Sequence, residues 1–103
     1  MSRFILFALF FAFGNGLIAQ NMPPEVKKIT DKYACNSCHV LDKRVVGPSW
    51  KDLAQKKYSA KKMFKLIREP QPGNWPDYPP MAPIPSISSA EVKLVADWLN
   101  GLN

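Results

Sequence analysis

The chain has few of the side chains that structural zinc sites use, because its 103 residues include only two cysteines and one histidine. All three lie within residues 34–40, ACNSCHV, which leaves no cysteine or histidine elsewhere in the sequence. A structural zinc site needs four ligands, most often cysteine or histidine. The sequence therefore argues against a structural zinc site.

The sequence also lacks an apolar run long enough to span a membrane as a helix, which requires about 20 residues. Its most apolar run, Phe4–Phe13, has ten residues, follows the basic Arg3 and precedes small residues. This layout predicts a secretory signal peptide over residues 1–19, cleaved after Ala19, with cleavage after Gly16 as the alternative. A further alternative is an uncleaved N-terminal anchor. In either case the rest of the chain is expected to be exported.

The predicted mature chain, residues 20–103, is a single small domain with limited apolar material of its own. Five of the six phenylalanines lie in the predicted signal peptide. The remaining 84 residues carry 13 Lys and Arg against 8 Asp and Glu, a net charge of +5. Because so short a chain builds only a marginal core, a disulfide, a metal or a cofactor is expected to supplement it.

No segment of the mature chain shows the sustained alternation of apolar and polar residues that is typical of strands. Serines at capping positions and apolar residues at helical spacing instead predict an all-α fold of about four short helices. The predicted helices are Pro24–Tyr33, a short helix capped by Ser49, a helix from Ser59 to Pro70, and a last helix that opens with Ser88 and Glu91 as a capping box. The apolar faces of the first and last helices are expected to pack together.

A proline-rich segment separates the last two predicted helices. Seven of the ten prolines lie between residues 70 and 85, which excludes a helix or a central strand there. The segment also contains Trp75, Tyr78, Met81 and Ile84, which is unusual for a solvated linker. We therefore expect a stiff loop that wraps around another group.

Three interpretations compete for the cluster Cys35-Asn36-Ser37-Cys38-His39. A thioredoxin-like redox pair would need a strand-to-helix junction, and the sequence shows no convincing strand. A disulfide between Cys35 and Cys38 can form in an exported protein, although so short a loop would add little stability. The C-x-x-C-H spacing is that of a haem attachment motif, in which both thiols reach one edge of the haem and His39 ligates the iron. The expected export and the need for extra core favour haem attachment.

Four segments of the mature chain, CNSCH, VVGPSWKDLA, NWPDYPPMAP and SSAEVKLVADWL, extend this interpretation. Together they resemble a class I c-type cytochrome, in particular the short single-haem bacterial cytochromes c of the periplasm. The resemblance covers nearly all of the mature chain. It implies a small cytochrome c fold around one covalently attached haem c, and a soluble periplasmic electron carrier whose iron cycles between Fe(II) and Fe(III).

The resemblance also assigns site residues. Cys35 and Cys38 would form the thioether bonds to the haem, and His39 would be the proximal iron ligand. The carbonyl of Pro48 would accept a hydrogen bond from Nδ1 of His39, which would fix the tautomer and orientation of the ring. Met81 would be the second axial ligand, since ligation by His and Met is the recognised arrangement in cytochromes c.

Other positions carry weaker implications. Trp75 matches a tryptophan that donates to a haem propionate, with a core position as the alternative. The stretch from Trp75 to Met81 is about one residue longer than in similar proteins. A basic propionate partner is expected near the third helix, where Lys65 and Arg68 are both candidates. The side chains expected to pack in the core are those of Trp50, Trp98, Met22 and Met63.

Redox proteins are the expected partners, and they would dock near the exposed haem edge or at a basic patch. Six lysines fall within fifteen residues of the second and third predicted helices, at positions 51, 56, 57, 61, 62 and 65. Such a patch steers an acidic partner, although an ordinary solvated surface is the alternative. Nucleic acid is not an expected partner, because an exported chain rarely meets it. No transmembrane segment is expected after removal of the signal peptide.

The sequence thus predicts an electron carrier and not an enzyme, because assigning the sole histidine to iron leaves no acid–base constellation. Two alternatives remain open. One is a haem sensor or enzyme with an open sixth position at the iron. The other is a cytochrome c subunit held in a larger oxidoreductase complex.

Overall fold

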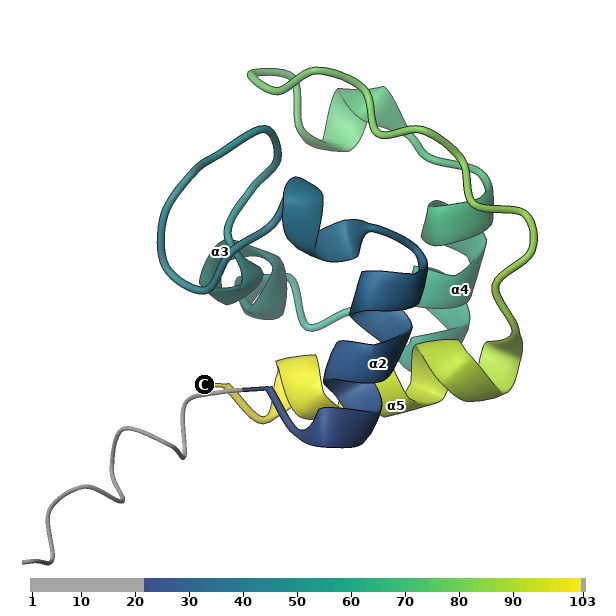
Figure 1. The fold of residues 1–103 in the computed structure, drawn as a ribbon. Coiled ribbons are helices and arrows are strands. Elements are labelled where there is room, and N and C mark those ends of the chain that lie inside the picture. Colours follow the sequence, from purple (N-terminus) through teal and green to yellow (C-terminus); the bar gives the residue numbers. More distant parts are fainter. Residues whose placement is uncertain (1–21, 103) are drawn as a thin grey trace, which may run out of the picture.

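The computed structural model describes residues 22–102, so the predicted signal peptide and its cleavage sites lie outside the described residues. Within this range four α-helices form, namely α2 (Pro24–Lys32), α3 (Trp50–Gln55), α4 (Ala60–Arg68) and α5 (Ser89–Asn100). Two short 3-10 turns, η2 (Cys35–Ser37) and η3 (Pro72–Asn74), lie in the connections (Figure 1). Across residues 22–102 no helix is both long enough and apolar enough to cross a membrane.

Serine caps begin three of the helices, as the sequence predicts. The Oγ of Ser49 accepts a hydrogen bond from the backbone N–H of Asp52 at 3.0 Å, and Ser59 caps α4 in the same way. At α5 the capping box is complete: Ser88 Oγ accepts from the N–H of Glu91, and the Glu91 carboxylate accepts from the N–H of Ser88. These bonds satisfy N–H groups that the first turn of a helix leaves without partners.

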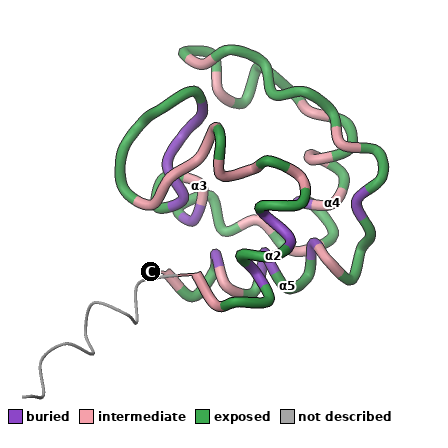
Figure 2. Tube along the Cα trace, in the orientation of Figure 1, coloured by how far each residue is buried: buried purple, intermediate pink, exposed green. Residues whose placement is uncertain are grey.

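Helix α5 is the central element of the core, because it packs against α2, α3 and α4. The predicted pairing of the first and last helices is confirmed: Val26 and Ile29 of α2 share one buried cluster with Val95 and Leu99 of α5. Figure 2 shows buried residues along these two helices and in the segment that enters α3. The long loop between α4 and α5 is exposed over most of its length, so the core lies to one side of that loop.

The side chains predicted to fill the core do so. Trp50 is 6% exposed and packs edge-on against the half-buried Trp98, with ring centroids 5.5 Å apart. Met63 is buried on the inner face of α4. Met22 packs against the same cluster, and its sulfur lies 3.1 Å from the hydroxyl of the fully buried Thr30. Neither Met22 nor Met63 lies in the proline-rich loop, where a different methionine is found.

A junction at Glu91 joins α2 to α5. The phenol O–H of Tyr33 donates to one carboxylate oxygen at 2.7 Å, and Nζ of Lys32 donates to the other at 3.1 Å. The backbone N–H of Ser88, the Tyr33 hydroxyl and Lys32 lower the pKa of Glu91 to about 2. Each of these partners stabilises the ionised carboxylate, so the junction depends on the charge of Glu91.

Replacing Glu91 with glutamine should weaken this junction at neutral pH but not in strong acid. The folded-state pKa of Glu91 lies below its ordinary value of 4.5, so ionised Glu91 stabilises the fold fully above about pH 4.5. That contribution should be lost as the pH falls from 4.5 towards 2. In denaturant titrations at several pH values, the stabilities of the wild type and Glu91→Gln should converge with increasing acidity. The control is Asp97→Asn in the same helix, which removes only an exposed pair with Lys93. A wild-type advantage that stays constant down to pH 2 would contradict the assigned junction.

Candidate cofactor site

A cavity of about 520 Å³ lies between the helical core and the proline-rich loop. Its walls come from segments far apart in the sequence, namely η2 with the residues that follow it, α4, and the loop over residues 70–84. In Figure 1 this loop arches across the top and right of the molecule, away from η2 and α3. Six apolar side chains that form the cavity floor and wall are Ile29, Leu53, Leu66, Ile67, Val95 and Leu99.

The residues that the sequence singles out meet at this cavity. All six of them, Cys35, Cys38, His39, Pro48, Trp75 and Met81, contribute to its lining. The first four lie within residues 35–48 and the last two within 75–81, with 26 residues of chain between the groups, so only the folded structure brings them together. The tertiary structure therefore defines one candidate site from two distant motifs.

The imidazole of His39 is held in one orientation by the loop that follows it. Its Nδ1 lies 2.7 Å from the carbonyl oxygen of Pro48, so Nδ1 carries the proton and donates it to this bond. The ring also lies against Trp50, with centroids 5.0 Å apart. Burial lowers the pKa of His39, and the bond to Pro48 partly opposes that shift. The result is a neutral imidazole whose Nε2 keeps its lone pair for a metal.

Gly47 permits this approach of the loop to His39. A Cβ at position 47 would lie 2.7 Å from Cε1 of His39 and 3.1 Å from its Nδ1. The backbone N–H of Gly47 donates to the carbonyl of Cys38 at 2.8 Å, which closes the loop at its base. Any side chain at position 47 would thus push into the ring that Pro48 orients.

Cys35 begins the 3-10 turn η2 and Cys38 directly follows its end, and both thiols are free. The backbone N–H groups of Cys38 and His39 both donate to the carbonyl of Cys35, which winds the three residues into one tight turn. Ala34 precedes this turn in the left-handed conformation, with φ 60° and ψ 25°, and ends α2. Burial raises the pKa of the Cys35 thiol. The turn therefore presents two free thiols and one imidazole to the same cavity.

Met81 lies on the opposite segment, in the proline-rich loop. Its side chain is 39% exposed and lines the cavity, so it is an apolar group that no other part of the described chain covers fully. The flanking Pro80 and Pro83 restrict the backbone on either side of it. Beyond them, the N–H of Ile84 donates to the carbonyl of Ile67 at 3.0 Å, which anchors the loop to α4.

The expected basic propionate partner does not appear in the cavity lining. Neither Lys65 nor Arg68 contributes to it, and Arg68 instead donates from Nε to the carbonyl of Pro85 at 3.2 Å. Two neutral side chains that the sequence analysis missed, Gln71 and Asn74, do line the cavity beside Trp75. The sequence could have indicated them only by their position just before Trp75 in a proline-rich loop. Because amides are uncharged, a search for basic partners of the propionates does not find them.

This donor set fits a haem and fits few other groups. The two free thiols suit covalent attachment of a haem, and the imidazole with a free Nε2 and the thioether of Met81 are the two axial ligands that the iron of a cytochrome c uses. The remaining lining is largely apolar, as a porphyrin face requires. Such a helical fold with one apolar cavity and these four donors defines the class of small c-type haem proteins.

Comparisons with known proteins agree with this class. No protein-family model matches the chain. The chain is 35% identical over 71 residues to cytochrome c-551 of Pseudomonas denitrificans, which covers 64% of this chain and 83% of that protein. It is 33% identical over 75 residues to cytochrome c-552 of Nitrosomonas europaea, covering 69% and 72%. The solved structure of wild-type Nitrosomonas europaea cytochrome c552 matches with a TM-score of 0.64 over 75% of this chain and 99% of that one, at 33% identity.

The chain belongs to the small class I bacterial cytochromes c that are named c-551 and c-552. The all-α cytochrome c fold predicted from the sequence is thereby confirmed. The cofactor of this family is covalently bound haem c with its iron, which confirms the predicted cofactor. The roles of the individual residues remain predictions of the sequence and the cavity geometry.

Proposed function

We propose that this protein is a soluble periplasmic electron carrier whose haem c is held by Cys35, Cys38, His39 and Met81. The observation that carries the proposal is that these four side chains, from two distant segments, line one apolar cavity. The haem supplies a reversible one-electron change between Fe(III) and Fe(II). The proposal assigns no catalytic residue, in keeping with a family of electron carriers.

The protein side chains would set the iron environment and keep it constant. His39 would ligate through Nε2, because Pro48 occupies Nδ1 and fixes the direction of the ring. Met81 would supply a soft thioether, which favours the reduced iron and raises the reduction potential relative to two histidines. With both axial positions taken by side chains on restrained segments, little rearrangement accompanies a change of charge at the iron.

The propionate end of the haem would face Trp75 and its neighbours. Trp75 would donate its indole N–H to a propionate, and the side-chain amides of Gln71 and Asn74 are available beside it. The structure thus favours neutral donors over Lys65 or Arg68 for this role.

Export is part of the proposal and rests on the signal-peptide layout of residues 1–19. Haem is attached to C-x-x-C-H motifs outside the cytoplasm, so the motif and the leader point to the same compartment. One sample tests both: protein expressed in a periplasm that has the haem-attachment machinery. Its intact mass should equal the chain from residue 20 plus one haem, and its oxidised spectrum should show methionine ligation.

Three results would contradict the proposal in different ways. A mass without haem would remove Cys35 and Cys38 as attachment sites. Ready binding of CO by the ferrous protein would indicate an open sixth position and thus a sensor or enzyme. A mass that retains residues 1–19 would leave the haem site intact but replace the soluble carrier with an anchored one.

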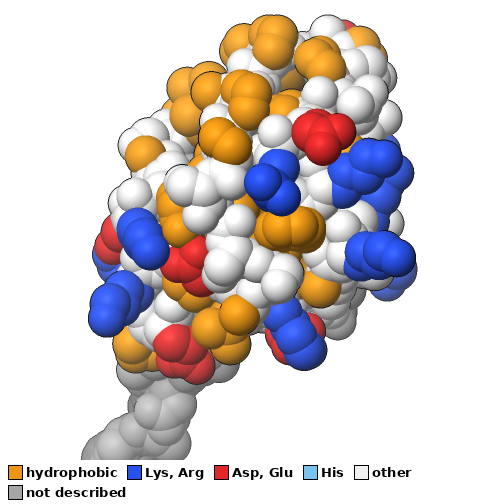
Figure 3. Space-filling model, turned by 90° about the vertical axis from the view of Figure 1, so that its right-hand side faces the viewer, with side chains coloured by type: hydrophobic (Ala, Val, Ile, Leu, Met, Phe, Trp, Pro, Cys, Tyr) orange, Lys and Arg blue, Asp and Glu red, His pale blue; other side chains and the backbone are white. Residues whose placement is uncertain are grey.

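Redox partners would dock at the cavity mouth, guided by the lysines of α3 and α4. Val45 and Val46, each 46% exposed, lie with Met81 among the exposed apolar side chains. Figure 3 shows apolar side chains gathered over the upper part of one face, with basic side chains along its flank. An apolar contact area bordered by positive charge suits brief docking of an acidic partner.

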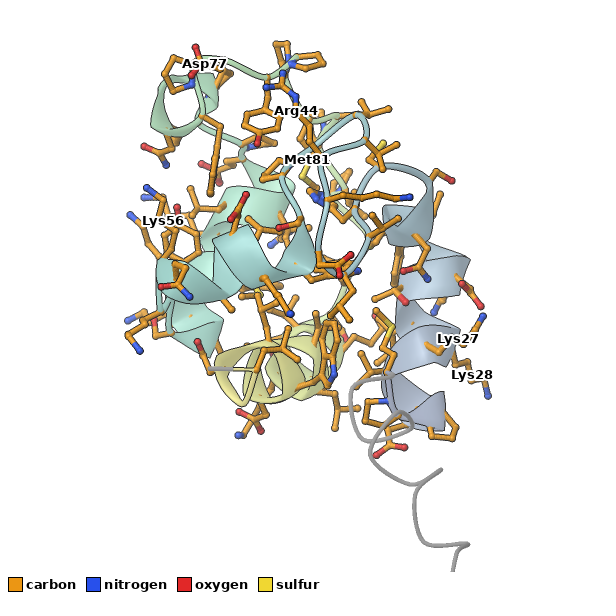
Figure 4. The ribbon with its side chains drawn as sticks, turned by 90° about the vertical axis from the view of Figure 1, so that its left-hand side faces the viewer. Lys27, Lys28, Arg44, Lys56, Asp77 and Met81 are labelled. Atoms are coloured by element: carbon orange, nitrogen blue, oxygen red, sulfur yellow. The ribbon has the colours of Figure 1, made fainter. Side chains whose placement is uncertain are left out.

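The lysine patch predicts a salt-dependent reaction rate. Neutralising Lys61 and Lys62 together with glutamine should slow reduction by an acidic redox partner several-fold at low ionic strength, and the deficit should vanish at high salt. Stopped-flow absorbance measures this. The matched control neutralises Lys27 and Lys28, which Figure 4 places on α2, on the side of the molecule away from Lys56. Equal rates for the two double variants would contradict steering by the lysine patch and would identify it as an ordinary solvated surface.

A further inference from the structure

Two basic side chains reach from the half of the molecule that carries His39 to two aromatic rings of the proline-rich loop. The guanidinium carbon of Arg44 lies 3.9 Å from the centroid of the Tyr78 ring. The Nζ of Lys56 lies 4.9 Å from the centroid of the Trp75 ring. Both distances are within the range of cation–π attraction. Each contact joins two segments that are distant in the sequence, residue 44 with residue 78 and residue 56 with residue 75.

The four side chains form one connected group, which we name the cation–aromatic clasp (Arg44, Lys56, Trp75 and Tyr78). Trp75 and Tyr78 pack edge to face, with ring centroids 5.8 Å apart. Arg44 also donates a hydrogen bond from its guanidinium to the carbonyl of Asp77, which lies between Trp75 and Tyr78 in the sequence. Figure 4 shows Arg44 near the turn that carries Asp77, in agreement with this bond. The clasp thus grips the loop at two rings and one carbonyl.

The loop that carries Arg44 is held by backbone hydrogen bonds near His39. Arg44 lies in the loop between His39 and Pro48, and both ends of that loop are tied by backbone bonds. The N–H of Gly47 donates to the carbonyl of Cys38, and the N–H of Trp50 donates to the carbonyl of Val40, each at 2.8 Å. Arg44 therefore projects from a rigid support.

The loop around Met81 has few other restraints. Among residues 22–102, the backbone groups of residues 79–83 make no backbone–backbone hydrogen bond. The nearest such bonds are the local turn from the N–H of Tyr78 to Trp75 and the anchor from Ile84 to Ile67. Between these two points, prolines at positions 79, 80 and 83 stiffen the chain, but they have no backbone N–H with which to bond it to the core. Fixing Tyr78 therefore fixes the place of Met81, three residues further on.

We propose that the cation–aromatic clasp positions the Met81 loop over the cavity, with Arg44 as its main positioning residue. The inference rests on the proposed function, since the purpose of the positioning is to keep the thioether of Met81 at the iron. Without the clasp, the loop would be held at Ile84 and at η3 but free to swing between them. Exogenous ligands would then reach the sixth position more often.

The test compares Arg44→Ala with Lys43→Ala, its exposed neighbour, and with the conservative Arg44→Lys, all as oxidised haem-loaded protein. Two rates are measured: displacement of the methionine-dependent absorption by added imidazole, and hydrogen exchange at the Tyr78 amide. Arg44→Ala should speed both rates by about tenfold, the effect of losing one cation–π contact and one hydrogen bond. Arg44→Lys should recover part of the loss, and Lys43→Ala should behave as the wild type.

A second pair of variants separates the aromatic ring from general packing. Tyr78→Phe keeps the ring and should leave both rates unchanged, whereas Tyr78→Leu should speed both rates, by less than Arg44→Ala because the bond from Arg44 to Asp77 remains. Equal hydrogen exchange in Arg44→Ala and Lys43→Ala would overturn the clasp. Failure of the proposed function would look different, because the wild type itself would then lack the methionine-dependent absorption. In that case, hydrogen exchange at the Tyr78 amide would still test whether the clasp restrains the loop.

Discussion

Replacing Met81 with alanine should abolish the methionine–Fe(III) charge-transfer absorption while leaving the haem covalently attached. Met81 lines the cavity from the loop that faces the C-x-x-C-H turn, and it is 39% exposed in the protein alone. Its loss removes the thioether but neither thiol, so the mass of the product should still include one haem. The reduction potential should fall by a substantial part of the roughly 0.8 V that axial ligands span.

The ferrous form of Met81→Ala should also bind CO, which the wild type should resist. The matched control is Met22→Ala, because Met22 packs against the buried cluster and does not line the cavity. It should retain the absorption and the potential, with only a modest loss of stability. Persistence of the charge-transfer band in Met81→Ala would show that another group is the distal ligand.

Adding a single methyl group at Gly47 should lower the stability of the fold and disturb the orientation of His39. The new Cβ would lie 2.7 Å from Cε1 and 3.1 Å from Nδ1 of His39, and 3.3 Å from the carbonyl oxygen of Cys38. His39 cannot turn away without cost, because Nδ1 is bound to Pro48 and the ring packs on Trp50. Overpacking of this kind costs about 1–3 kcal/mol.

Gly47→Ala should therefore lower the yield of haem-loaded protein, reduce the midpoint of denaturant unfolding and alter the potential through a tilted imidazole. Gly73→Ala is the matched control, because a Cβ there would have no neighbour within 4 Å. That variant should be neutral or gain up to about 1 kcal/mol from reduced freedom of the unfolded chain. If Gly47→Ala kept the wild-type potential and midpoint, the tight contact between position 47 and His39 would be refuted.

Local chemistry explains why the helices could be predicted closely from the sequence. Ser49, Ser59 and Ser88 each cap a helix through a bond to a backbone N–H only three residues away. Such bonds depend on neighbours in the chain and require no tertiary context. The first helix ends at Lys32 instead of the predicted Tyr33, because the left-handed Ala34 turns the chain into η2.

The sequence indicated the candidate donors for a similar reason. The spacing of Cys35, Cys38 and His39 is itself the chemical requirement, since a short turn must present two thiols and an imidazole together. Met81 stood out because it lies among prolines and not on a helical face. A resemblance to a known family then supplied the roles, and the structure places all four side chains on one cavity.

Long-range contacts could not be predicted, because they depend on where distant segments meet. Glu91 was predicted only as a capping residue, yet it also receives Tyr33 and Lys32 from a helix nearly sixty positions earlier. The basic propionate partner expected on α4 is absent from the cavity lining, and the contacts of Arg44 with Tyr78 left no mark in the sequence.

By itself, then, the sequence determined the helix starts and indicated the C-x-x-C-H turn as the candidate attachment site, because both depend on spacing within a few residues. It also indicated Met81 as a candidate ligand, through the prolines around it. Only the tertiary structure decided which face of each element lines the cavity, how Gly47 and Pro48 orient His39, and what holds the loop of Met81 in place. The physical reason is that packing and cation–π contacts act through space, whereas capping and motif spacing act along the chain.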